Sequence, residues 1–101
     1  MSYKVNNNDM SALCGTCLRG YVYATYDQLV EMFGQPRDDI DKSSAHWAIR
    51  FDDGEVASIY DWKTQVVPEN MYRWHIGGHR DDMPWRIDEI LKLEKVALNA
   101  L

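Results

Sequence analysis

The sequence predicts a small α+β domain in which an antiparallel sheet of about three to four strands packs against a short helix and precedes a C-terminal helix. Three features support this fold class: a helix with clear start and stop signals near residue 26, a hairpin signature at Asp53-Gly54, and an apolar helical stripe near the end of the chain. The expected order of elements is β-α-β-β-β-α. We expect residues 1–12 to form a flexible N-terminus and residues 13–101 a single domain, with residues 80–101 as its helical extension.

The best-marked element is a helix over residues 26–33. Thr25 is a favourable N-cap, and Gln28, three residues later, completes a capping box. Gly34 and Pro36 then end the helix. One face is apolar because four side chains share a helical spacing: Tyr26, Leu29, Val30 and Phe33. A short strand over residues 20–24 is expected immediately before this helix.

A β-hairpin follows, with strands at residues 45–51 and 55–62. Asp53-Gly54 has the composition preferred in a two-residue type I′ turn. This turn predicts the pairs Phe51–Val56, Ile49–Ser58, Trp47–Tyr60 and Ala45–Trp62 on one side, and Arg50–Ala57, Ala48–Ile59 and His46–Asp61 on the other. The His46–Asp61 pair resembles the base and its orienting carboxylate in a catalytic triad. No serine has the context of a nucleophile, so we interpret this pair as a polar cross-strand contact.

The last two elements are a strand over residues 72–76, ending at Gly77-Gly78, and a helix over residues 84–99. The helix has an unusually broad apolar face, formed by Ile87, Ile90, Leu91, Leu93, Val96, Leu98 and Leu101. Such breadth is typical of a helix that is buried between two surfaces or that pairs with another chain. A homodimer through this helix is therefore one expectation.

The composition restricts the classes of function. The chain has 101 residues, 11 Lys and Arg against 16 Asp and Glu, a net charge of -5 and 46% hydrophobic residues. This describes one folded domain with no apolar run near the roughly 20 residues of a membrane span. Because phosphate binding needs a basic surface, direct nucleic-acid binding is not expected. No secretory signal and no established catalytic motif is recognised, which predicts a cytosolic protein that is not an enzyme.

The first candidate site is acidic and surrounds the hairpin. Its acidic residues are Asp38, Asp39, Asp41, Asp52, Asp53 and Glu55. The same stretch contains only three basic residues, Arg37, Lys42 and Arg50. A negative edge of this kind suits docking into the basic channel of another protein. The alternative interpretation is a solvated hairpin end that protects the strand edges.

The second candidate site surrounds the Gly-Gly pair and would bind a nucleotide. Its residues are Trp62, Lys63, Arg73, Trp74, His75, Gly77, Gly78 and Arg80. Paired glycines can expose backbone N–H groups to an anion, and tryptophan rings can stack on a base. The alternative is a strand that ends in a Gly-Gly turn, with Trp74 in the core.

The third candidate is a zinc site formed by Cys14, Cys17, His75 and His79. The C-x-x-C and H-x3-H spacings supply the four ligands that structural zinc requires. The 57 residues between Cys17 and His75 make the site depend entirely on the fold. A redox motif would need a buried strand before the cysteines, which this sequence lacks. Two ordinary thiols remain the simpler interpretation, and no other cofactor is expected.

Four motifs together resemble a largely uncharacterised group of small bacteriophage proteins. They are TYxxLxxxFGxP (25–36), WxIxFxDG (47–54), IYDWK (59–63) and WHIGG (74–78), within a resembling region of residues 20–78. The resemblance implies a setting, the cytoplasm of an infected bacterial host, rather than a mechanism. The leading hypothesis is therefore a counter-defence protein that binds and inhibits a host or immune protein, such as a CRISPR effector. The alternatives are a nucleotide-binding protein that sequesters a defence second messenger and a zinc-stabilised structural domain.

Overall fold

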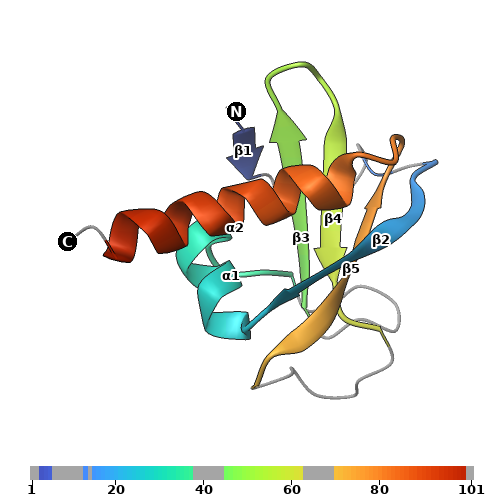
Figure 1. The fold of residues 1–101 in the computed structure, drawn as a ribbon. Helices are drawn as coiled ribbons and strands as arrows, with labels where there is room; N and C mark the ends of the chain where they lie inside the picture. Colours follow the sequence, from blue (N-terminus) through green and yellow to red (C-terminus); the bar gives the residue numbers. More distant parts are fainter. Residues whose placement is uncertain (1–2, 6–12, 14, 38–44, 63–69, 100–101) are drawn as a thin grey trace.

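The computed structural model describes residues 3–5, 13, 15–37, 45–62 and 70–99, with side chains up to residue 93. These described residues form seven elements: β1 (Tyr3–Val5), β2 (Cys17–Ala24), α1 (Tyr26–Phe33), β3 (His46–Phe51), β4 (Val56–Tyr60), β5 (Tyr72–Gly78) and α2 (Met83–Asn99). The strands form one antiparallel sheet in the order β1-β3-β4-β5-β2, with α2 lying across it (Figure 1). The α+β fold class predicted from the sequence is confirmed.

The sheet has five described strands rather than three to four, because part of the expected flexible N-terminus forms β1. Tyr3 pairs with Phe51, and its ring packs against Phe33 of α1 with centroids 5.6 Å apart. A three-residue strand is too short to show a periodic pattern, so only this tertiary contact marks it. Residues 6–12, which the same prediction included, lie outside the described residues.

Helix α1 has the bounds and the caps that its sequence predicts. The Thr25 hydroxyl accepts a hydrogen bond from the Gln28 N–H (3.2 Å), and the Gln28 side-chain oxygen accepts one from the Thr25 N–H (2.8 Å). Gly34 ends the helix with φ 77° and ψ -168°, a conformation that is almost restricted to glycine. Leu29 and Phe33 are buried on the inner side of the helix.

The hairpin register differs from the predicted one by a single residue. The Gly54 N–H donates to the Phe51 carbonyl (3.0 Å), and the Phe51 N–H donates to the Glu55 carbonyl (2.8 Å), so the loop has three residues, Asp52-Asp53-Gly54. Gly54 takes φ 88°, as the last residue of such a loop requires. The observed pairs are His46–Tyr60, Trp47–Ile59, Ala48–Ser58, Ile49–Ala57 and Arg50–Val56. The two-residue turn was wrong because an Asp-Gly pair suits both loop lengths, and a shift of one residue exchanges the two faces of β4.

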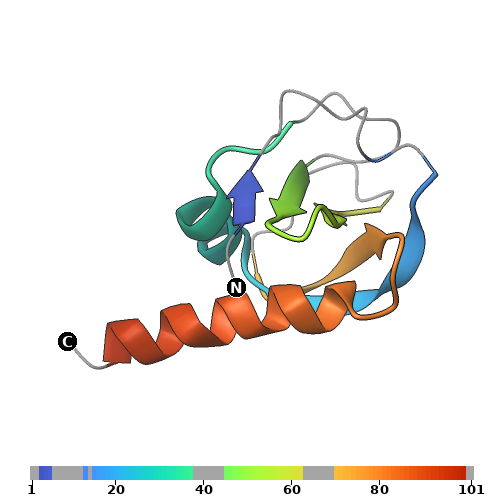
Figure 2. The ribbon, with the colours of Figure 1, turned by 90° about the horizontal axis from the view of Figure 1, so that it is seen from above.

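The first face of the sheet holds the hydrophobic core, and both helices pack against it (Figure 2). Strand side chains that point into this core are Val22, Ala24, Trp47, Ile49, Phe51, Ala57, Ile59, Trp74 and Ile76. Leu29 and Phe33 of α1 close one end, while α2 contributes Met83, Ile87, Ile90 and Leu91.

Helix α2 begins one residue before the predicted start and is only partly covered. Trp85 and Leu93 are 59% and 64% exposed, on the side of the helix away from the sheet. The side chains of Val96, Leu98 and Leu101 lie outside the described part of the chain, so the homodimer through this helix stays a prediction. No described helix combines the length and the apolar character that crossing a membrane requires.

Candidate functional site

The second face of the sheet carries a row of four rings, one from each of four adjacent strands. Tyr21 of β2, His75 of β5, Tyr60 of β4 and His46 of β3 stand directly opposite one another in the strand register. Successive ring centroids are 5.0, 5.2 and 5.3 Å apart. These spacings are within the range of attractive aromatic contacts. We call these four residues the aromatic row.

Two further side chains extend the aromatic row at its β5 position. Trp62, just after β4, lies 6.2 Å from the Tyr60 ring and 6.5 Å from the His75 ring, measured between centroids. The Arg73 guanidinium lies 4.1 Å above the centre of the Tyr21 ring, a cation–π contact. Arg73 and Tyr23 are a cross-strand pair next to His75 and Tyr21, so the charge lies on the same face as the rings.

The row is covered at one end and accessible at the other. Both ring nitrogens of His46, and Nδ1 of His75, are buried and have no hydrogen-bond partner among the described residues. Tyr21 is 39% exposed and Trp62 43% exposed. A molecule arriving from solvent therefore meets Tyr21, Trp62 and Arg73 first.

Burial keeps the row uncharged near neutral pH. Loss of solvent lowers the pKa of His46 from 6.5 to about 4; Asp61 opposes this shift and Arg37 adds to it. Burial, with a smaller contribution from Arg73, also lowers the pKa of His75. Burial raises the pKa of the Tyr60 phenol. The rings therefore act as flat apolar surfaces that retain a few unused hydrogen-bonding atoms.

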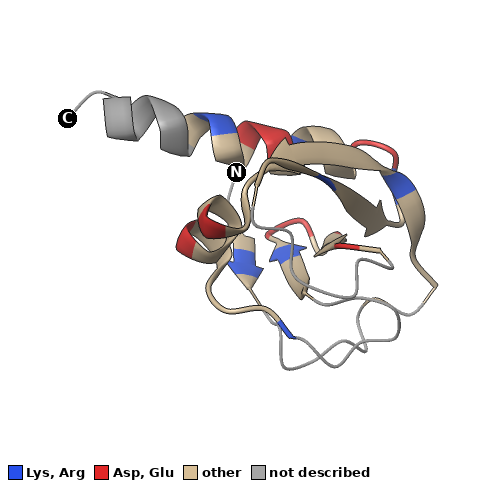
Figure 3. Cartoon of the chain, turned by 90° about the horizontal axis from the view of Figure 1, so that it is seen from below, with Lys and Arg blue, Asp and Glu red and all other residues tan. Residues whose placement is uncertain are grey.

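The charge on the sheet has the opposite sign to that of the whole chain. None of the described strand residues is acidic, whereas the strands contain Lys4, Arg19, Arg50 and Arg73. Arg19 is taken up by the Gly78 and His79 carbonyls and by Asp81. The acidic residues therefore lie outside the described strands, as the red positions on both helices and on the β3–β4 turn show (Figure 3). The sequence of α2 contains as many basic as acidic residues, so this helix adds no net charge.

The structure brings together part of the predicted nucleotide site. Trp62, Arg73 and His75 meet on the second face, as described above. Trp74 lies on the first face instead: it is fully buried, and its Nε1 donates to the Ala24 carbonyl (2.9 Å). Arg80 follows β5 and lies 3.5 Å from Asp82. Lys63 is outside the described residues.

Gly77 and Gly78 do not form the exposed anion-binding turn that the sequence suggested. Both are buried inside β5, a central strand, and pair with β2 and β4 on either side. A Cβ atom on Gly77 would lie 2.5 Å from Ser58 Oγ, and one on Gly78 would lie 2.5 Å from Met83 Cγ. The glycines are needed because neighbours approach the strand closely from both faces.

Only three of the six residues of the predicted acidic site are described, and one of these, Asp53, forms a salt bridge. Asp38, Asp39 and Asp41 lie outside the described residues. Asp52, Asp53 and Glu55 share the β3–β4 turn, where Asp53 Oδ2 lies 2.8 Å from Arg86 Nη2 of α2 and Asp53 Oδ1 accepts the Glu55 N–H (3.0 Å). The hydrogen bond from Arg86 lowers the pKa of Asp53. This contact fixes the turn against the start of α2.

The predicted zinc ligands do not converge within the described residues. His75 belongs to the aromatic row, whereas His79 lies beside Gly15 and exposed Cys17 pairs with Gly78. Three residues along a strand separate His75 from Gly78, about 10 Å. Cys14 lies outside the described residues, and no cluster of three metal-binding side chains occurs in the remainder that the structure describes.

Sequence reasoning did not identify Tyr21 and Tyr60 as members of a site, and it interpreted His46 as a polar cross-strand partner of Asp61. With the hairpin register shifted by one residue, Tyr60 was placed opposite Trp47 and His46 opposite Asp61. Asp61 is in fact buried, and its Oδ1 accepts the Ala45 N–H (2.9 Å). A three-residue loop at 52–54 would have placed both rings on the face of His75.

Comparison with known protein families, curated proteins and solved structures finds no match to this chain.

Proposed function

We propose that the protein is a small non-enzymatic binding protein, and that it binds a nucleotide on the accessible end of the aromatic row. The base would stack against the rings of Trp62 and Tyr21, and the phosphate would lie beside Arg73. Stacking of a base on an aromatic side chain contributes on the order of 1–3 kcal/mol and tolerates any base. Nδ1 of His75, a buried ring nitrogen with no partner among the described residues, lies next to this end of the row.

One observation carries this proposal: a continuous aromatic surface lies next to a cation on a sheet with no acidic strand residue in its described part. The overall negative charge argued against nucleic acid, but a small ligand meets only the local surface. The site also contains three of the residues predicted for nucleotide binding: Trp62, Arg73 and His75.

The resemblance to small bacteriophage proteins supplies the biological setting of the proposal. In the cytoplasm of an infected bacterium, sequestering a nucleotide second messenger would silence an immune response that depends on it. Sequestration requires tight binding but no chemistry, in agreement with the absence of a recognised catalytic motif in the sequence.

The test is a thermal-shift screen with cyclic nucleotides and ADP-ribose derivatives from micromolar to millimolar concentration. A ligand at 100 times its Kd raises the free energy of unfolding by about 2.7 kcal/mol, a shift that is readily measured. Trp62→Ala and Arg73→Gln should each weaken binding of the selected ligand at least about tenfold. The proposal fails if no ligand shifts the melting temperature.

Arg80→Gln is the matched control for this screen. Arg80 belongs to the same basic stretch of sequence, but the structure places it after β5, beside Asp82. Its substitution should leave the affinity unchanged. Equal losses from Arg80→Gln and Arg73→Gln would show that binding follows general positive charge rather than the aromatic row.

A second candidate function is inhibition of a host protein through the acidic turn. The specific observation in its favour is the Asp53–Arg86 contact, which holds Asp52 and Glu55 in a fixed place at the end of the hairpin. A rigid negative tip suits a basic channel better than a mobile one, since less conformational entropy is lost on binding.

Capture experiments from infected bacteria distinguish the two functions. Asp52→Lys together with Glu55→Lys should abolish recovery of the host protein and leave the nucleotide shift intact. Asp81→Lys, at an acidic side chain that is 92% exposed elsewhere, is the control. Recovery of the same protein by all variants would eliminate the acidic turn as the binding surface.

A further inference from the structure

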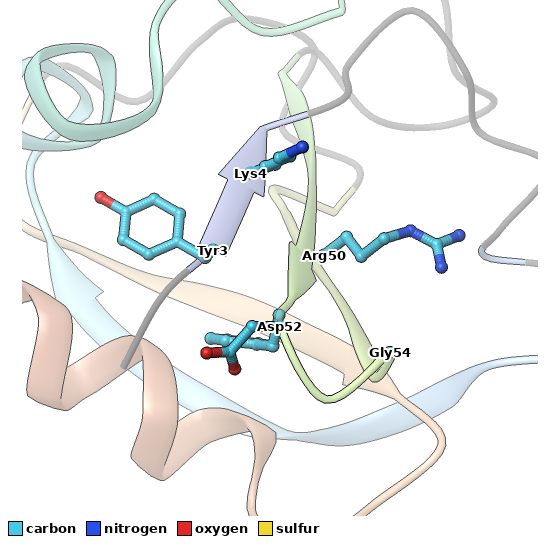
Figure 4. Close-up of a pocket in the computed structure, with 6 residues that line it drawn as sticks. Tyr3, Lys4, Arg50, Asp52 and Gly54 are labelled. Carbon is cyan, nitrogen blue, oxygen red and sulfur yellow. The ribbon is translucent and has the colours of Figure 1, made fainter.

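We propose a separate phosphate-binding site at the β1–β3 edge, formed by Lys4 and Arg50. These two residues, here called the cation pair, are directly opposite each other in the register of β1 and β3. Both side chains are exposed and extend to the same side of the strands, away from the Tyr3 ring (Figure 4).

Two like charges in this arrangement repel each other. Residues directly opposite on antiparallel strands have Cβ atoms about 4.5–5.5 Å apart, and like charges there are destabilising. Neither Lys4 nor Arg50 forms a salt bridge with another described residue, unlike Arg19, Arg86 and Lys92, which each contact a carboxylate. An anion between the two cations would convert the repulsion into two attractions.

The surroundings provide room for such an anion. A cavity of about 410 Å³ opens at this position, lined by Tyr3, Lys4, Arg50, Phe51, Asp52 and Gly54. In Figure 4 the Asp52 carboxylate lies on the side of the Tyr3 ring, whereas the cation pair reaches the other way. The neighbouring Asp53 is held by Arg86, which lowers its tendency to compete for the pair.

Phosphate fits this pair better than a single carboxylate does. The guanidinium of Arg50 can form two parallel hydrogen bonds to phosphate oxygens, and the Lys4 ammonium provides a point charge for the remaining negative charge. The ligand is therefore either inorganic phosphate or the terminal phosphomonoester of a larger molecule.

This site is distinct from the proposed nucleotide site. Arg50 lies four residues from His46 along β3, about 13 Å at the usual rise of a strand, and Arg73 is two strands beyond β3. Each site can therefore fail without the other.

The experiment measures melting temperatures with inorganic phosphate or adenosine 5′-monophosphate, in each case against sodium chloride at equal ionic strength. The chloride arm removes simple screening of the cation pair, which any salt produces. We expect a saturable rise of several degrees, on the order of 4–8 °C, from at least one of the two phosphates. A rise with inorganic phosphate indicates the free anion, and a rise with the nucleotide alone indicates a phosphomonoester of a larger ligand.

Lys4→Gln combined with Arg50→Gln should remove the rise and retain the fold, because the variant relieves the repulsion and both side chains are exposed. Lys92→Gln, which removes a cation on α2, should keep the rise. The nucleotide arm is repeated in Trp62→Ala, which removes the aromatic site but not this one. The proposal is overturned if phosphate and chloride act alike, or if the double variant still shows the rise.

Discussion

The two faces of the sheet differ in whether their buried ring nitrogens have hydrogen-bond partners. On the first face, the indole N–H groups of Trp47 and Trp74 donate to the carbonyls of Gly34 and Ala24, at 2.8 and 2.9 Å. On the second face, three buried ring nitrogens of His46 and His75 find no partner among the described residues. On the first face, both indole N–H groups are thus hydrogen-bonded within the fold, whereas on the second face the ring nitrogens remain without described hydrogen-bond partners.

This difference separates residues that hold the fold from residues that are available to a ligand. An unsatisfied buried polar group costs about 1–3 kcal/mol, so its retention needs a compensating role. The second face also carries the cation pair and Arg73, which the described acids do not neutralise. If the comparison is correct, substitutions on the first face change stability, and those on the second face change binding or its dependence on pH.

The largest effect is expected from comparing Trp74, on the first face, with Trp62, beside the second face. Trp74→Ala removes a fully buried ring and should lower the free energy of unfolding by about 3–5 kcal/mol. Trp62→Ala removes a ring that is 43% exposed, and should cost about 1 kcal/mol through lost aromatic contacts. Urea denaturation of both variants measures the difference. Similar losses would mean that the second face is also core.

A smaller effect, confined to acid, is expected from His46. Because the pKa of His46 is about 4 in the folded protein and near 6.5 when unfolded, the unfolded state binds more protons between these values. The free energy of unfolding should therefore fall as the pH drops from 6.5 to 4, by about 3 kcal/mol in total. Urea denaturation at pH 7, 5.5 and 4 measures this fall.

His46→Phe keeps the ring stacked on Tyr60 but cannot take up a proton, so it should lose most of the dependence on pH in this range. His75→Phe should lose less, since the pKa of His75 is lowered to a smaller extent. Parallel pH profiles for the wild type and His46→Phe would show that His46 titrates normally and that this end of the row is open to water.

The sequence predicts one face of this molecule much better than the other. The bounds of α1 follow from Thr25, Gln28 and Gly34, because caps are local interactions between neighbours in the chain. The aromatic row depends on the register of the hairpin, and Asp53-Gly54 permits loops of two or three residues. Local propensity cannot decide between them; burial of Trp47, Ile49 and Ile59 on one face does. β1 could not be predicted for the same reason, because it depends on the tertiary contacts of Tyr3 with Phe51 and Phe33 rather than on a local pattern.

The smallest effect is expected where the hairpin turn meets the first face, at the Asp53–Arg86 contact. Asp53→Asn keeps the acceptor for the Glu55 N–H but removes the charge that Arg86 neutralises. Because Arg86 lowers the pKa of Asp53 in the folded state, the stabilisation is complete above the unfolded pKa of 3.8 and is lost as the pH falls through the folded value. Exposed ion pairs contribute little and are screened by salt. The loss of unfolding free energy at pH 7 should therefore be smaller than that of Trp74→Ala or Trp62→Ala, and it should shrink at high salt.

Asp52→Asn is the control for this last comparison, since Asp52 lines the same cavity as the cation pair and has no contact with Arg86 among the described residues. Its substitution should leave the free energy of unfolding at pH 7 nearly unchanged and should strengthen phosphate binding by removing a negative charge from the cavity. Asp53→Asn should instead lower the free energy of unfolding and leave phosphate binding unchanged, because the Asp53 carboxylate is paired with Arg86. If both variants change the free energy of unfolding equally, α2 does not hold the turn. The inference of a rigid acidic turn would then be wrong, and so would the inference that Asp53 does not compete for the cation pair.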